Sequence, residues 1–213
     1  MINNIIFDLD GTLVDSADDI IDCLSRAYSA ATLTCNTKID KSFIGPPLQN
    51  IIHSVSPDLD SRNVEKIMRH FRTYYDTSNL TKTTFKKKAL ETLHYFKAHN
   101  KQLFIVTNKP IIPTEIILKN LNIAFFCDII TPDVQTGLTL NKSEMVSFLK
   151  QKWKLNAATT LMVGDTATDV YAAREHGIIS AVVLNGYGDR DSIEKSKPEY
   201  MIDSLDELEV IIS

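Results

Sequence analysis

Five short apolar runs recur along the chain, each rich in β-branched residues and bounded by polar residues or glycine. A strand that is buried on both faces has a near-continuous apolar sequence rather than an alternating one. We therefore expect five buried parallel strands. They fall at residues 5–9 (IIFDL), 103–108 (LFIVTN), 127–131 (CDIIT), 160–165 (TLMVGD) and 180–185 (SAVVLN).

The segments between these runs have helical spacing. Apolar residues recur three or four positions apart in residues 89–99 and 143–152, and in the segment that follows Pro113. A fourth helix is expected at residues 169–175, with Gly177 placed to end it. Strands that alternate with helices indicate an α/β fold of the doubly wound, Rossmann-like kind, with a parallel sheet covered on both faces.

The stretch from Asp15 to about Thr84 breaks this alternation, because it has two helical patterns and no convincing strand. The first pattern opens at Ser16, which has the spacing of a capping box with Asp19. The second contains Val64, Ile67, Met68, Phe71, Tyr74 and Tyr75. We predict two domains: an α/β core of residues 1–14 and 86–213, and an inserted all-helical cap domain of residues 15–85.

Composition narrows the class of protein. With 44% hydrophobic and 23% charged residues, the 213-residue chain is typical of a soluble globular protein. A net charge of -4 with mixed signs gives no basic surface for nucleic acid or an anionic membrane, so neither is an expected partner. The apolar runs are too short for a signal peptide or a membrane span, which predicts a cytoplasmic protein. The three cysteines lack the spacing of metal ligands.

Acidic residues follow two of the predicted strands. Asp8 and Asp10 lie two apart, so an extended backbone points both carboxylates to one side, just before Gly11. Asp165 and Asp169 follow the fourth run, and parallel strands bring both groups to the same edge of the sheet. Helix or turn capping is the simpler alternative for such residues. Carboxylates that converge repel one another without a divalent cation, and oxygen ligands favour Mg2+ over zinc.

Groups able to hold a phosphate are expected at the same edge. Thr107, Asn108 and Lys109 follow the second run, and Lys142 opens a later helix. Hydroxyl, amide and ammonium donors can share the oxygens of a phosphoryl group. We favour Lys142 over Lys109, because Pro110 directs the chain after Lys109 away from helix. Either lysine alone is more often a solvated surface residue.

Four motifs together carry a resemblance. In order and spacing, "DLDGT", "VTN", Lys142 and "GDTATD" resemble the four motifs of the haloacid dehalogenase superfamily. The helical insertion, with "FIGPPL" at residues 43–48, is similar to that of phosphoglycolate-phosphatase-like members. One departure is Ser143, where such relatives often have a proline after the lysine.

The resemblance implies a role for each motif. Asp8 would be the nucleophile, and Asp10 the general acid that later serves as base. Mg2+ would bind the Asp8 side chain, the Asp10 backbone carbonyl and Asp165, with Asp169 in a supporting position. Phosphate would be held by Thr107, Asn108 and Lys142, of which Thr107 and Lys142 would also take part in catalysis. In the insertion, Gly45 and Pro46 are expected to contact the substrate.

These roles predict a Mg2+-dependent phosphatase that forms an aspartyl-phosphate and acts on a small phosphorylated metabolite, with phosphoglycolate as the leading candidate. The cap would close over the site and exclude water. A phosphoryl-transferring sugar-phosphate mutase or a pyrophosphatase on the same scaffold is the nearest alternative. A phospho-receiver or binding module without turnover is less consistent with Asp10 and the insertion. Either a monomer or a homodimer is compatible with the sequence.

Overall fold

The computed structural model describes residues 1–133 and 139–212, so the parts of the predicted core at 134–138 and 213 lie outside it. Its contacts divide the chain into two compact units: Met1–Asp15 with Phe85–Ser213, and Ser16–Thr84. The sequence-based boundaries lie one residue from these at both crossings. The crossings fall in β2 (Val14–Asp15) and β3 (Thr84–Phe85), which pair as a small separate sheet.

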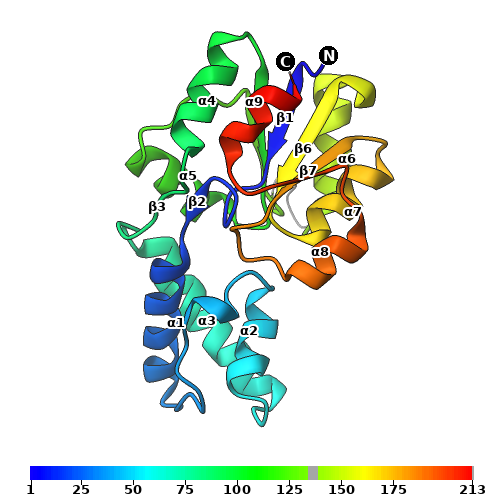
Figure 1. The fold of residues 1–213 in the computed structure, drawn as a ribbon. Helices are drawn as coiled ribbons and strands as arrows, with labels where there is room; N and C mark the ends of the chain where they lie inside the picture. Colours follow the sequence, from blue (N-terminus) through cyan, green and yellow to red (C-terminus); the bar gives the residue numbers. More distant parts are fainter. Residues whose placement is uncertain (134–138, 213) are drawn as a thin grey trace. The chain divides into compact units, whose positions relative to one another are not determined.

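The first unit is built on a six-stranded sheet in the order β5-β4-β1-β6-β7-β8, with parallel pairing throughout (Figure 1). Each of the five predicted strands is confirmed, and β8 is an additional edge strand. The prediction of a doubly wound α/β core is therefore confirmed. The strands are β1 (Asn4–Phe7), β4 (Gln102–Val106), β5 (Asp128–Ile130), β6 (Thr160–Gly164), β7 (Ile179–Val183) and β8 (Tyr200–Ile202).

Helices cover both faces of this sheet. On one face, Ile6 and Phe104 pack with residues of α6 and α7 in one buried apolar cluster. On the other face, the ring of Phe7 lies 6.4 Å from that of Phe96 in α4. This alternation of Ile6 and Phe7 explains why the strands are apolar on both sides. The helices of the unit are α4 (Ala89–Ala98), α5 (Ile111–Asn120), α6 (Lys142–Trp153), α7 (Ala167–Glu175), α8 (Arg190–Ser196) and α9 (Leu208–Ile211).

The four helices predicted for the core correspond to α4, α5, α6 and α7, and the chain leaves α7 through Gly177, at φ 66°. The sequence did not predict α8 and α9, which have only seven and four residues. A helix that short shows too few apolar repeats to be distinguished from a loop. Within the described residues, no helix has the length and apolar character to cross a membrane.

The second unit is helical, as expected for the insertion. In α1 (Ala17–Ala31) and α3 (Ser61–Thr77), the predicted apolar stripes pack against each other. The structure adds α2 (Leu48–Val55), which begins directly after Pro47, and a short helical turn η1 (Lys41–Phe43). Gly45 has φ 121°, and both Gly45 and Pro46 are exposed between η1 and α2.

The predicted capping box at the start of α1 is wrong. Ser16 precedes the helix, but its side chain makes no capping hydrogen bond. Asp19 is buried, and one oxygen of its carboxylate accepts hydrogen bonds from the backbone N–H of Lys82 (3.1 Å) and from the backbone N–H and hydroxyl of Thr83 (both 2.7 Å). A contact 64 residues away in sequence has replaced the local one. Asp19 thereby joins the two ends of the helical unit.

Replacement of Asp19 by alanine should destabilise the protein, because it leaves buried donors without an acceptor. We expect a loss of about 2 kcal/mol in the free energy of unfolding, as is usual for hydrogen bonds to a charged group. The free energy of unfolding is measured by urea denaturation of the variant and the wild type. Asp18→Ala is the matched control, since Asp18 is half exposed and its ion pair with Lys41 is a surface pair. Equal stability of the two variants would contradict the role of Asp19.

Candidate active site

The ends of three neighbouring strands bring the predicted residues together. β1 lies between β4 and β6, with Phe7 in register with both Ile105 and Val163. Asp8, Thr107 and Asp165 therefore follow adjacent strands at the carboxyl edge of the sheet, where open α/β sheets bind ligands. Chain segments that are 98 and 156 residues apart in sequence pair directly here.

A cluster of three buried carboxylates occupies this edge. One oxygen each from Asp8, Asp165 and Asp169 lies within 4.8 Å of the others. Asp169 reaches the cluster because α7 starts directly after β6. The capping alternative also holds for it, because its carboxylate accepts the hydroxyl hydrogen of Thr166 at 2.7 Å and forms a capping box. Asp169 thus contributes both to the start of the helix and to the cluster.

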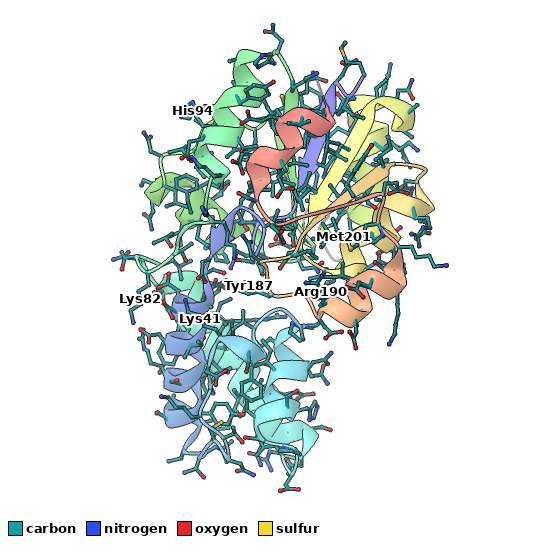
Figure 2. All side chains as sticks on the ribbon, viewed as in Figure 1. Lys41, Lys82, His94, Tyr187, Arg190 and Met201 are labelled. Atoms are coloured by element: carbon teal, nitrogen blue, oxygen red, sulfur yellow. The ribbon has the colours of Figure 1, made fainter. Side chains whose placement is uncertain are left out.

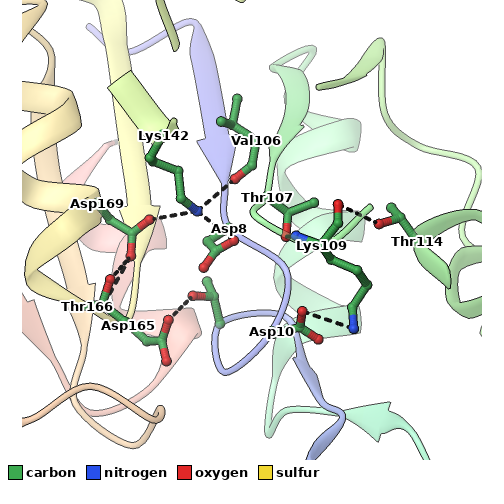
Figure 3. A network of polar contacts seen from close by, with 11 residues as sticks. Asp8, Asp10, Val106, Thr107, Lys109, Thr114, Lys142, Asp165, Thr166 and Asp169 are labelled. Carbon is green, nitrogen blue, oxygen red and sulfur yellow. Dashed lines mark hydrogen bonds and ion pairs between the residues drawn. The ribbon is translucent and has the colours of Figure 1, made fainter. Parts of the chain in front are cut away.

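Lys142 brings a positive charge to the cluster, as the sequence indicated. Its ammonium nitrogen lies 2.8 Å from Asp8 and 3.1 Å from Asp169, and it donates a hydrogen bond to the Val106 carbonyl at 3.1 Å (Figure 3). The side chain is only 2% exposed. It starts α6, where Asn141 and Glu144 form a capping box. The position of this ammonium group is therefore fixed by both helix and sheet.

Ser143, the departure from the usual lysine–proline sequence, has its own contacts. Its hydroxyl donates to Glu175 at 2.6 Å and lies 3.0 Å from the ring of His176. Both partners lie at the end of α7. These bonds join the first turn of α6, which carries Lys142, to the helix that carries Asp169.

A second buried lysine lies on the other side of the site. The ammonium nitrogen of Lys109 is 3.1 Å from the Asp10 carboxylate, and its side chain is 3% exposed. The position of the Lys109 side chain could not be predicted from the sequence, because Pro110 predicts that the chain after Lys109 is directed away from helix. The Thr107 hydroxyl accepts a hydrogen bond from the Lys109 backbone N–H at 3.2 Å, whereas Asn108 is exposed in the same loop.

The loop between β7 and α8 also supports the site, and no sequence motif predicted its contribution. Tyr187 lies in this loop (Figure 2). Its backbone N–H donates to Asp165 at 2.7 Å, and its hydroxyl donates to Asp15 at 2.8 Å. A Cβ atom on Gly186 would lie 2.2 Å from the Asp165 side chain, and one on Gly11 would lie 2.0 Å from it. Glycine is thus required at both positions for this close approach.

Burial and like charges shift the acid–base equilibria of this cluster. Burial, opposed by Lys142, raises the pKa of Asp8 to about 6. The pKa of Asp165 is raised well above its ordinary value by burial and by the charges of Asp8 and Asp169. Burial lowers the pKa of Lys142, but Asp169 and Asp8 outweigh it and hold that pKa above its ordinary value.

The donor set fits a divalent cation. Four carboxylates and two ammonium groups meet at this edge, which leaves two negative charges when all are ionised. The cluster offers carboxylate oxygens, the ligands of hard cations such as Mg2+. The residues that could hold the ion are Asp8, Asp165 and Asp169, while the Asp10 carboxylate pairs with Lys109.

Comparison with known proteins shows the family of this chain. Residues 5–183 match the family model described as haloacid dehalogenase-like hydrolase, and the chain belongs to this family of enzymes. It is 28% identical to a phosphoglycolate phosphatase of Vibrio parahaemolyticus, covering 98% of this chain and 95% of the relative. It is 26% identical to the pyrophosphatase PpaX of Oceanobacillus iheyensis, covering 99% and 97%. A solved haloacid dehalogenase-like hydrolase from Streptococcus pneumoniae has the same fold, with a TM-score of 0.87, 24% identity and coverage of 100% and 99%.

The raised pKa of Asp8 predicts how stability depends on pH without metal. Asp8 has a pKa of about 6 in the folded protein, above its value in the unfolded chain. Its contribution to stability is therefore fully present below about pH 4 and is lost as the pH rises through about 6. The pKa of Asp165 is also raised, so its ionisation likewise lowers stability as the pH rises. Asp8→Asn cannot ionise, so at pH 8 its free energy of unfolding should exceed that of the wild type by roughly 3 kcal/mol.

Urea unfolding between pH 4.5 and pH 8 in chelator measures this difference. Asp58→Asn is the control, because Asp58 is exposed in a turn of the other unit and should leave the pH dependence unchanged. If the free energy of unfolding of Asp8→Asn follows that of the wild type at every pH, ionisation of Asp8 does not destabilise the folded protein.

Proposed function

We propose that this hydrolase is a Mg2+-dependent phosphatase that acts on a small phosphorylated metabolite through an aspartyl-phosphate at Asp8. The observation that carries the proposal is the buried ion pair of Asp8 and Lys142 beside Asp165 and Asp169. A phosphoryl group needs positive charge around it before a carboxylate can attack, and this edge has both the ammonium group and the ligands for a cation.

Two steps account for turnover. In the first, a carboxylate oxygen of Asp8 bonds to phosphorus while the bond to the leaving oxygen breaks, and Asp10 gives that oxygen its proton. In the second, Asp10 takes a proton from water, whose oxygen attacks phosphorus and releases inorganic phosphate. The second step restores both carboxyl groups, so the enzyme returns to its starting state.

The other site residues hold the phosphoryl group. Lys142 neutralises charge next to the attacking oxygen, and the hydroxyl of Thr107 and the amide of Asn108 donate to phosphoryl oxygens. Mg2+, held by Asp8, Asp165 and the Asp10 backbone carbonyl with Asp169 in support, would offset the remaining negative charge when bound. The same cation would favour the ionised forms of Asp8 and Asp165, whose pKa values are raised by burial and by neighbouring carboxylates.

Phosphoglycolate is the leading substrate, supported by the name of the Vibrio parahaemolyticus relative. Pyrophosphate is the second candidate, because a relative of similar identity is a pyrophosphatase. A phosphate-release assay on a panel of small metabolites, ranked by kcat/KM, distinguishes them. The proposed location is the cytoplasm, where such metabolites occur.

Removal of the metal or of the nucleophile should abolish turnover. We expect no phosphate release in chelator, with recovery on addition of millimolar Mg2+. Asp8→Asn should lower kcat by about four orders of magnitude or more, because water would have to attack without the covalent route. Full activity after rigorous metal removal would refute the cation, and retained turnover in Asp8→Asn would refute the nucleophile.

Pro46→Ala tests the contribution of the helical unit to selectivity. Pro46 is exposed within its own loop, so its loss should leave the melting temperature nearly unchanged. If the loop contacts the substrate, kcat/KM should shift between members of the metabolite panel while hydrolysis of a generic aryl phosphate stays constant. A lower melting temperature with the same substrate ranking would contradict this role.

A further inference from the structure

We propose that Lys109 is a positioning residue that orients the carboxyl group of Asp10 toward the leaving oxygen. The inference rests on the proposed phosphatase function, in which Asp10 protonates that oxygen. The sequence offered Lys109 only as a candidate phosphate-holding group, and Lys142 was favoured over it. The structure pairs its ammonium nitrogen with Oδ2 of Asp10 at 3.1 Å.

The two partners differ in exposure in a way that fits this role. The Lys109 side chain is 3% exposed, whereas that of Asp10 is 23% exposed. The lysine is therefore the more buried partner, and part of the Asp10 side chain reaches the surface. Contact with one carboxyl oxygen restricts rotation of the group and so fixes the direction of the other oxygen. General acid catalysis requires this alignment, because the proton must reach the leaving oxygen within hydrogen-bond distance.

The backbone of Lys109 is itself held in place. Its N–H donates to the Thr107 hydroxyl at 3.2 Å, which ties it to a proposed phosphate-holding group. The next residue, Pro110, precedes α5, and its carbonyl accepts a hydrogen bond at 2.8 Å from the buried hydroxyl of Thr114. The ammonium group thus extends from a fixed loop, so its position can define that of Asp10.

The two lysines contact different carboxylates of the site. Lys142 contacts Asp8 and Asp169, on the side of the nucleophile, and Lys109 contacts Asp10, on the side of the acid (Figure 3). A buried ammonium group without a partner is costly, so Lys109 is also stabilised in place by Asp10. The pair is therefore a unit, and loss of Lys109 should impair the function of Asp10 and leave that of Asp8 intact.

Leaving groups of different basicity provide the test. p-Nitrophenolate departs without a proton, whereas an alkoxide needs one. Lys109→Met should therefore lower kcat roughly 100-fold on the alkyl phosphate that the wild type hydrolyses best, which is a typical contribution of general acid catalysis. On p-nitrophenyl phosphate the same variant should lose less than about tenfold. Lys101→Met is the control, because Lys101 binds the carbonyl of Ile2 at the opposite end of β4 and should affect neither substrate.

Additivity shows whether Lys109 acts through Asp10. If it does, adding Lys109→Met to Asp10→Asn should cause little further loss on the alkyl ester, since coupled residues are not additive. Lys109→Gln keeps a donor for Asp10 and provides a second, better-tolerated variant, for which we expect a smaller preferential loss on the alkyl ester than in Lys109→Met. Circular dichroism melts establish that each variant is folded.

Equal losses on both esters, or additive losses in the double variant, would overturn the inference while leaving the phosphatase proposal standing. A wild type that hydrolyses neither ester would overturn the proposed function and this inference with it.

Discussion

Repulsion among carboxylates at one edge of the sheet is the constraint on which the site depends. Asp8, Asp165 and Asp169 are buried within a few ångströms of each other, at a position where water cannot screen them. Lys142 offsets part of that charge, while burial and the charge of Asp169 raise the pKa of Asp8. The remaining charge fits the proposed cation, which when bound would make the edge favourable for a phosphoryl anion.

The fold supplies this edge by topology rather than by local sequence. Parallel pairing of β1 with β4 and β6 gathers side chains from three distant segments, and α7 starts close enough to β6 for Asp169 to join them. The N-terminus of α7 also carries a partial positive charge, which favours an anion in its first turn. Close approach of the loop that carries Gly186 then leaves Asp165 held by a backbone N–H.

Much of this could be predicted from the sequence, because buried parallel strands and helices with regular spacing have local signatures. The runs that end at Asp8 and Asp165 are examples, and parallel topology then places their carboxylates together. Tyr187 could not be found in this way, since its contacts to Asp15 and Asp165 are 172 and 22 residues away. The capping box at Ser16 failed for the same reason: a distant partner of Asp19 outweighed a local rule.

The groups around Asp8 and the pair of Asp10 with Lys109 contribute differently to substrate specificity. The edge formed by Asp8, Lys142 and the proposed cation recognises only a phosphoryl group, which phosphoglycolate and pyrophosphate share. Their leaving groups differ, because phosphate departs readily whereas an alkoxide needs a proton. A carboxyl group that is held in orientation by a buried lysine is of most use for the alkoxide. If Asp10 is the proposed acid, its pairing with Lys109 would favour a phosphate ester of an alcohol over pyrophosphate as the substrate.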